Sequence, residues 1–470
     1  MKTLIKNGTI ITAYEEFEGD ILIEEEKIVD IGKDLAASCV KVDKIIDASG
    51  KLVFPGGVDQ HTHYDAQGTV GDKNTAGYET TDNAIVGGTT TFVEFVPQEE
   101  GMGLIDSAEY RKKHRAEGKI CVDYALHALV TDVKPAIFDE VEKLPEYGIS
   151  TIKVFMAYPG SYLHADDGTL MRILEKSKNV GVTTFVHAEN GEIIEFLRDE
   201  CVRSGNTAPK YHYLSRPPVS ESEAARRAIY LAKAAAAPLF IVHMTCEEAL
   251  EELRIAKSGR LNVYGETCTH YLVTTKAALD NPDFMEAAKY ICSPALRDEK
   301  DCEALWEALD SGLLSAVSSD HCGISLKEMK LAGKDDFTKV PNGAPGAGDR
   351  LNMVWTNGVA KGRISKTKFV EICATNPAKI NGIYPRKGHI GIGSDADLVI
   401  FDPQYKGVVR QRDNPNGIDY NIFEGREQIG RPETVLLRGK VVVENARFTG
   451  KKGQGTFIKA KPYGACYRGL

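Results

Sequence analysis

The middle of the chain alternates between short apolar segments and helix-like segments. The apolar segments, which we predict to be strands, occupy residues 58–63, 89–96, 121–130, 151–157, 183–187, 239–244, 261–266 and 314–320. The helix-like segments between most of them occupy residues 79–86, 105–117, 135–142, 168–178, 221–235, 247–257 and 298–309. Eight strands that alternate with helices predict an α/β fold with a closed, TIM-like (β/α)8 barrel, and a doubly wound open sheet is the alternative.

Both ends of the chain, by contrast, are rich in strand-like segments. Residues 4–11 hold two apolar runs around Asn7-Gly8, a pattern that predicts a hairpin. Further strand-like runs occur at residues 21–23, 27–31, 45–46, 396–401 and 435–443, the last turning at Arg438-Gly439. We therefore expect a second, small β-sandwich domain built from residues 1–53 and 385–449. The barrel would span residues 54–384, and residues 450–470 would form a C-terminal tail.

Composition and charge narrow the class of protein. The net charge is −9, and no basic tract is dense enough to indicate nucleic-acid binding. No apolar run approaches the ~20 residues that span a bilayer, so we expect no membrane association. Met1 leads directly into a strand-like run rather than a signal peptide. The ten cysteines are scattered without a Cys-x-x-Cys pair, as reduced thiols are, and we therefore expect a cytoplasmic protein.

Polar side chains lie at the ends of several predicted barrel strands. His61 and His63 close the first strand, and because residues two apart on a strand share a face, both imidazoles can reach one ion. His187, His243 and Asp320 close the fifth, sixth and eighth strands in the same way. Barrel enzymes place their reacting groups at this end of the strands. The sequence therefore predicts a metal site in the mouth of the barrel.

Lys153 is the unusual member of this set, because it lies inside the apolar segment of the fourth predicted strand. A buried ammonium group without a partner is strongly unfavourable, so a lysine here calls for a chemical explanation. Taken singly, His187 or His243 would be a hydrogen-bonded core histidine, and Asp320 an ordinary loop carboxylate. Their combination at one mouth favours the metal site over those interpretations.

These residues and their local contexts resemble the hydantoinase/dihydropyrimidinase branch of the amidohydrolase superfamily. The matching motifs run over nearly the whole chain and are Pro55-Gly56-Gly57-Val58-Asp59-x-His61-x-His63, Lys153-Val-Phe-Met-Ala-Tyr158, Val186-His187-Ala188-Glu189-Asn190, Ser293-Pro-Ala-Leu-Arg297 and Asp320-His321-Cys322. The resemblance implies a barrel with a small β-sandwich, and a homotetramer or homodimer as the assembly. It also implies two zinc ions as cofactors, with manganese or cobalt as alternatives.

The resemblance further implies a role for each site residue. Lys153 would be N6-carboxylated, so that its cation becomes an anion that bridges both metal ions. His61, His63 and Asp320 would hold one ion with this bridge, and His187 and His243 would hold the other.

The activity implied by the resemblance is hydrolysis of cyclic amides and imides. The substrates would be small molecules, 5-substituted hydantoins and dihydropyrimidines, and the products N-carbamoyl amino acids. A zinc-bridging hydroxide would attack the ring carbonyl, Tyr158 would stabilise the oxyanion, and Asp320 would carry the proton to the departing nitrogen. Ser293 and Asn342 would bind the cyclic imide through backbone groups.

Three other functions compete with this interpretation. A dihydroorotase usually carries an arginine shortly after the second histidine, but here the first arginine after His63 is Arg111. An allantoinase would use the same metal residues and stays open as an alternative. A non-catalytic scaffold protein would have lost metal ligands, whereas every position of the set is present in this chain.

Several further segments carry weaker expectations. The loop at residues 64–74 is short and polar, which leaves the preferred ring substituent and its handedness open. Residues 449–470 are rich in glycine and lysine and too polar for a core, so we expect a disordered tail or, by the resemblance, a segment that packs on a neighbouring subunit. We expect His321 to point away from the site and Cys322 not to be needed for hydrolysis; His127 and His270 receive no role.

Overall fold

The computed structural model describes residues 1–35, 41–65 and 76–462. The central part of the chain forms a ring of parallel strands, which confirms the predicted barrel. In spatial order these strands are β6 (Gly57–His63), β7 (Thr89–Pro97), β8 (Asp123–Leu129), β9 (Thr151–Phe155), β10 (Thr183–His187), β11 (Leu239–Ile241), β12 (Val263–Cys268) and β13 (Ala316–Ser318). Each strand pairs in parallel with the next, so all of their carboxyl ends meet at one mouth.

One chain segment closes the ring. β13 pairs with β12, and two residues later β14 (His321–Cys322) pairs with β6 through Thr62 and His63. This closure excludes the open-sheet alternative. Because Asp320 lies between the two short strands, the seam of the barrel places it beside the end of β6.

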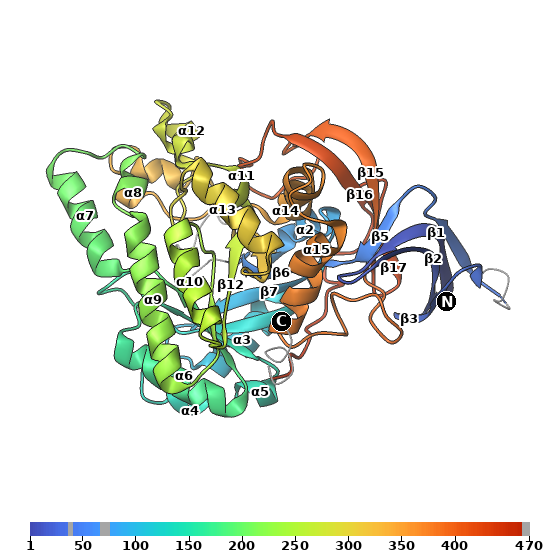
Figure 1. Ribbon diagram of the computed structural model, residues 1–470, viewed down its shortest axis with the longest axis horizontal. Helices are drawn as coiled ribbons and strands as arrows, with labels where there is room; N and C mark the ends of the chain where they lie inside the picture. The colour runs from blue at the N-terminus through green and yellow to red at the C-terminus, as the bar shows by residue number, and fades with distance from the viewer. Residues whose placement is uncertain (36–40, 66–75, 463–470) are drawn as a thin grey trace.

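Helices cover the outside of the ring, and several long ones lie side by side in Figure 1. These are α6 (Asp167–Val180), α9 (Pro218–Ala235), α10 (Glu247–Ser258) and α13 (Glu299–Asp310). Shorter helices are α2 (Asp82–Val86), α3 (Leu104–Tyr110), α4 (Ile137–Val141), α5 (Leu144–Tyr147), α8 (Tyr211–Leu214), α11 (Thr269–Val273), α12 (Phe284–Ala288), α14 (Arg350–Val354), α15 (Lys366–Val370) and α16 (Asn376–Ile380). Among the described residues, no helix combines the length and the apolar character that a membrane span requires.

One long helix, α7 (Gly191–Arg203), was not predicted, although its apolar residues repeat with a helical period as clearly as those of α6. Gly191 and Ile194 are its buried residues. Asn190 is a further signal for the start of this helix, because its side chain accepts a hydrogen bond from the Ile193 N–H at 3.1 Å as an N-cap.

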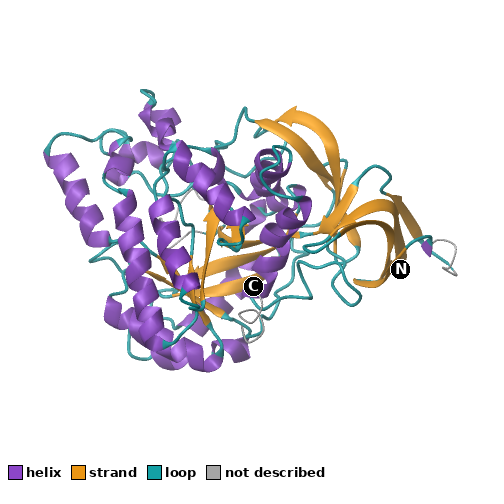
Figure 2. Ribbon diagram, viewed as in Figure 1, coloured by secondary structure: helices purple, strands orange, loops and turns teal. Residues whose placement is uncertain are grey.

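The strands from the two ends of the chain form a second sheet, separate from the ring (Figure 2). Its strand order is β18 (Arg447–Phe448), β17 (Lys440–Glu444), β16 (Glu427–Leu437), β15 (Leu398–Val408), β5 (Leu52–Pro55), β1 (Lys2–Ile11), β2 (Glu16–Glu24) and β3 (Lys27–Gly32), with β4 (Lys44–Asp47) also paired to β1. The apolar core of this sheet includes Ile28 of β3 and Leu436 of β16, which lie far apart in the strand order. The sheet therefore folds back on itself around one core.

Of the two predicted turns in this sheet, one is right and one is wrong. The chain turns tightly between β16 and β17 at Arg438 and Gly439, with φ of 45° and 74°, as a two-residue hairpin requires. Asn7-Gly8, however, makes no hairpin, because β1 runs straight through it. Asn7 has φ of 61° and sits at a shift in register against β2, so the left-handed residue forms a bulge instead.

The C-terminal segment also differs from the expectation. The Ile458 N–H donates to the Tyr124 carbonyl at 2.7 Å, and Ile458 is buried among Val58, Val93 and Ala125 of the barrel. This part of the segment, far from being too polar for a core, packs on its own chain against the barrel strands. The last residues of the predicted tail, 463–470, lie outside the described residues.

A buried cluster of charges joins the ring, the second sheet and the C-terminal segment. The Lys387 amino group lies 2.6 Å from Asp397 and 2.9 Å from Asp395, and it also pairs with Asp123 of β8. Asp123 in turn contacts Arg438, at the β16–β17 turn, and accepts the Thr456 N–H at 2.8 Å. Burial opposes the charge of Lys387, but the surrounding carboxylates raise its pKa and keep it a cation.

Removing this cation should destabilise the whole fold. In Lys387→Met three buried carboxylates lose the cation that they share, a loss that costs about 3–5 kcal/mol even though Asp123 keeps its contact with Arg438. We expect a lower urea midpoint, measured by circular dichroism, and little change in the exposed control Lys406→Met. An unchanged midpoint for Lys387→Met would show that the cluster does not hold these parts together.

Candidate active site

A cavity of about 430 Å³ opens at the carboxyl ends of the barrel strands. Every residue that the sequence assigned to the site lines this one cavity: His61, His63, Lys153, Tyr158, His187, His243, Ser293, Asp320 and Asn342. The wall also contains apolar side chains, among them Leu129, Phe155 and Leu163. The structure therefore brings the whole predicted set together.

His61, His63 and Asp320 form the tightest cluster in the cavity. The Nε2 atoms of His61 and His63 lie 3.2 Å and 3.5 Å from Asp320 Oδ1. Within the described residues, this trio is a group whose candidate ligand atoms all lie within 4.8 Å of one another. Two imidazoles and a carboxylate at these distances are suited to hold a divalent ion.

His187 and His243 face this cluster from the other side of the cavity. Their ring centroids are 4.5 Å apart, and the His243 ring lies 5.2 Å from that of His61. Burial lowers the pKa of both His187 and His243, which favours the neutral imidazole that binds metals. The Nδ1 atom of His243 has no hydrogen-bond partner in the described part of the chain.

Lys153 projects from β9 between these histidines. It is fully buried, and its Nζ atom has no hydrogen-bond partner among the described residues. The nearest aromatic rings, Phe95 and Phe155, lie 4.9 Å and 5.1 Å from Nζ. Burial lowers the pKa of Lys153 to about 7, so a large share of the neutral amine is present near neutral pH.

Two carboxylates behind the histidines were missed by the sequence analysis. Glu266 Oε1 lies 2.7 Å from His61 Nδ1, and Glu189 Oε2 lies 2.8 Å from His187 Nε2. Each carboxylate fixes one ring nitrogen and leaves the other for the cavity, an arrangement common behind metal-binding histidines. Glu266 could have been noticed in the sequence as a charged residue in an apolar strand. Glu189 could have been noticed as a carboxylate two positions after a histidine that ends a strand.

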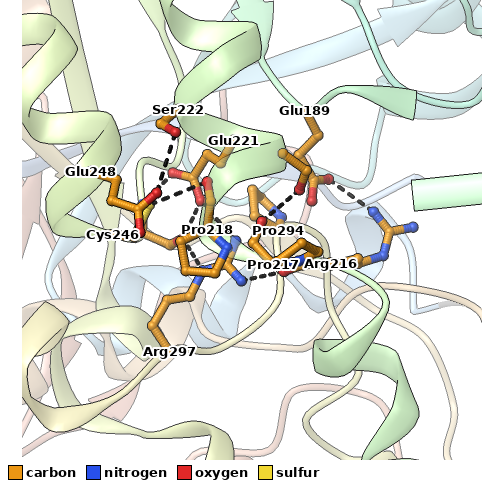
Figure 3. A network of polar contacts seen from close by, with 12 residues as sticks. Glu189, Arg216, Pro217, Pro218, Glu221, Ser222, Cys246, Glu248, Pro294 and Arg297 are labelled. Carbon is orange, nitrogen blue, oxygen red and sulfur yellow. Dashed lines mark hydrogen bonds and ion pairs between the residues drawn. The ribbon is translucent and has the colours of Figure 1, made fainter. Parts of the chain in front are cut away.

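Glu189 belongs to a buried network of polar contacts (Figure 3). It accepts a hydrogen bond from Arg216 at 3.0 Å, and Arg297 donates to the Arg216 carbonyl and pairs with Glu221 at 3.0 Å. Although burial opposes it, Arg216 together with His187 lowers the pKa of Glu189 to about 2. The carboxylate behind His187 is therefore held in its charged form.

Three of the cavity residues have a left-handed backbone. The φ angles are 62° at Tyr158, 40° at His243 and 49° at Asp320, a region that costs residues other than glycine about 1–3 kcal/mol. Such strain persists where the surrounding structure fixes it, and it is concentrated at functional sites. Here it coincides with three residues already selected for their chemistry.

Tyr158, Ser293 and Asn342 occupy one wall of the cavity. Burial raises the pKa of Tyr158, while Arg216 acts in the opposite direction. The phenol therefore keeps its proton at neutral pH and can donate it to an oxygen of a bound molecule.

The remaining strand-end residues lie outside the predicted chemistry. The His321 Nδ1 atom accepts the Gly346 N–H at 3.2 Å, and the ring stacks near Tyr64 rather than lining the cavity, as expected. His127 hydrogen-bonds to the Gln60 carbonyl at 2.8 Å in the barrel interior. Cys322 does line the cavity, but burial raises its pKa, so its thiol is not poised as a nucleophile. Most of the loop at residues 64–74 lies outside the described residues.

Comparisons with known proteins place the chain in a family. A model described as the amidohydrolase family matches residues 52–442. The chain is 46% identical to the D-hydantoinase of Ralstonia pickettii, over 98% of this chain and 100% of the relative. The crystal structure of dihydropyrimidinase from Brevibacillus agri is similar with a TM-score of 0.94 and 41% identity, covering 98% of this chain and 99% of the other.

The similarity extends to relatives of several bacteria. D-hydantoinase from Geobacillus stearothermophilus is 44% identical over 99% of this chain and 98% of the relative. The chain therefore belongs to the amidohydrolase family, and within that family it is a hydantoinase-type cyclic amidohydrolase.

Substitution of Glu266 tests whether this residue supports metal binding through His61. In Glu266→Gln the carboxyl group that fixes the His61 ring is replaced by an amide, and we expect divalent metal affinity to fall about 10–100-fold. Metal content after dialysis against graded concentrations of a chelator measures this affinity. The exposed control Glu307→Gln should bind metal like the wild type. Equal affinities for both variants would contradict the role given to Glu266.

Proposed function

We propose that this protein is a metal-dependent hydrolase that opens the ring of 5-substituted hydantoins and dihydropyrimidines to give N-carbamoyl amino acids. The observation that carries the proposal is the convergence of four histidines, Asp320 and an unpartnered Lys153 in one cavity. The D-hydantoinases and the dihydropyrimidinase to which the chain is similar support the substrate class.

The donor set fits a binuclear centre with a carboxylated lysine. An unpartnered buried amine is unfavourable, and its lowered pKa makes Lys153 nucleophilic toward carbon dioxide. Addition of carbon dioxide to Nζ forms an N–C bond, releases one proton and turns the amine into an anion. That anion lies among neutral imidazoles that can share two cations with it.

In this arrangement His61, His63 and Asp320 would hold one zinc ion, and His187 and His243 the second, with the Lys153 carbamate between them. Ions bound here would make a water molecule acidic enough to attack at neutral pH and would polarise the ring carbonyl. Manganese or cobalt would suit the same nitrogen and oxygen ligands.

Residues of this protein transfer the proton, stabilise the oxyanion and bind the substrate. Asp320 is positioned to accept the proton of the attacking water and to pass it to the departing ring nitrogen. The Tyr158 hydroxyl donates a hydrogen bond to the oxygen on which negative charge develops. Backbone groups of Ser293 and Asn342 bind the imide against the same wall.

The proposed domain division and compartment rest on the sequence pattern, and the proposed assembly rests on the family resemblance. We propose a division into residues 1–53 and 385–449 for the β-sandwich domain, residues 54–384 for the barrel and residues 450–470 for the tail. We also propose that the enzyme is a cytoplasmic homotetramer.

Allantoinase is the second candidate, because the metal residues would be the same. A panel of dihydrouracil, a bulky 5-substituted hydantoin and allantoin, assayed with zinc-loaded and chelator-stripped protein, separates the two functions. We expect metal-dependent ring opening of the hydantoin or dihydrouracil, followed by release of the N-carbamoyl product. Preference for allantoin would replace the substrate assignment, and turnover by the stripped protein would contradict the metal mechanism.

Lys153 provides a separate test of the bridging anion. In Lys153→Ala we expect metal content and turnover to be lost together, because the ligand between the ions is gone. A small added carboxylic acid can occupy the vacated space and should restore part of both. A variant that kept its metal and full activity would show that Lys153 is not a ligand.

A further inference from the structure

The wall of the cavity that contains Ser293 and Asn342 is made by two loops that are distant in the sequence. Ser293 comes from the loop after α12, and Asn342 from the loop after the 3-10 turn Phe337–Lys339. Both residues line the cavity together with Gly343. For the two residues to bind one ring at once, the spacing between their loops has to be fixed.

Lys330 lies behind this wall and is fully buried. Its Nζ atom donates to the Ala288 and Ile291 carbonyls, each at 2.9 Å. Within the described residues no carboxylate contributes to its electrostatic surroundings, and burial lowers its pKa to about 7. Lys330 thus differs from Lys387, which is surrounded by carboxylates, because its hydrogen-bond acceptors among the described residues are backbone carbonyls.

The Ile291 carbonyl is the point where the two loops meet. It accepts the Gly343 N–H at 3.1 Å as well as the Lys330 amino group. On either side of Ser293, His212 Nε2 bonds to the Cys292 carbonyl at 2.8 Å and the Tyr271 hydroxyl donates to the Pro294 carbonyl at 2.7 Å. Of these three side chains, Lys330 is the one that donates to the Ile291 carbonyl, where the two loops meet.

We propose that Lys330 is a positioning residue for substrate recognition, which sets the spacing between Ser293 and Asn342 by holding the Ile291 carbonyl. The assignment rests on the proposed function, because binding of the ring by Ser293 and Asn342 is part of that proposal. Lys330 does not line the cavity, so it acts through the two loops and not on the reacting atoms.

Loss of the Lys330 contact should affect KM and not kcat. The Ser293–Asn342 wall contacts the ring before and during attack, so a loosened wall weakens ground-state and transition-state binding alike. A loss of this kind raises KM and leaves kcat nearly unchanged. The candidate metal ligands lie on the barrel strands and at the barrel seam, so metal content should not change either.

The test compares Lys330→Met with the wild type and with Lys334→Met, an exposed lysine four positions further on. For Lys330→Met we expect an approximately tenfold higher KM for the ring substrate, with kcat and zinc content like the wild type. Lys334→Met should match the wild type in all three quantities. An unchanged KM in Lys330→Met, or a fall in kcat and zinc content at constant KM, would overturn the proposal.

A measurement without substrate separates this proposal from the proposed function. Amide hydrogen exchange at Gly343, whose N–H shares the Ile291 carbonyl, should be faster in Lys330→Met than in the wild type. If the wild type opened no ring, the proposed function would fail, and the exchange rate at Gly343 would still decide whether Lys330 ties the loops. If Lys330→Met does not fold, Lys330→Gln, a shorter neutral donor, takes its place in both measurements, and a wild-type KM and exchange rate in that variant would again overturn the proposal.

Discussion

A lysine amine held in the apolar interior without a counter-ion is the constraint on which the site depends. Lys153 lies between Phe95 and Phe155, and burial there lowers its pKa to about 7. In the proposed centre, conversion of this amine into an anion that faces two cations would remove the cost of the buried group, and the neighbouring neutral imidazoles suit such a centre. The carboxylates Glu266 and Glu189 stand behind the histidines, where they orient the rings and leave the centre of the cavity free for ions.

The rigid barrel is what allows this arrangement to persist. Its strands fix where His61, His187 and Lys153 emerge, and closure of the ring by one segment brings Asp320 to the end of β6. The left-handed backbone at Tyr158, His243 and Asp320 is unfavourable locally, and the surrounding structure has to maintain it. The wall of the cavity that contains Ser293 and Asn342 is also fixed from behind. Buried donors there hold loop carbonyls, and Ser293 and Asn342 face the cavity.

The sequence predicted those features that depend on local pattern and on strand ends. The alternation of segments indicated the barrel, and because parallel strands end at one mouth, the site residues could be grouped before any coordinates were known. Local pattern and strand ends do not predict which distant segments contact each other. Asn7-Gly8 has the composition of a hairpin but forms a bulge because β1 continues along β2. Ile458 sits in a polar segment yet is buried against the barrel. The partners of Glu266 and Lys330 likewise depend on how distant loops meet.

The measurement that tests the central claim most directly is anomalous X-ray diffraction, at the zinc absorption edge, from crystals of the zinc-loaded protein. We expect two anomalous peaks in the cavity, one beside His61, His63 and Asp320 and the other beside His187 and His243. Electron density for an added carboxyl group should extend from Lys153 Nζ to both peaks. A single peak, or two peaks with an unmodified Lys153 amine between them, would contradict the account.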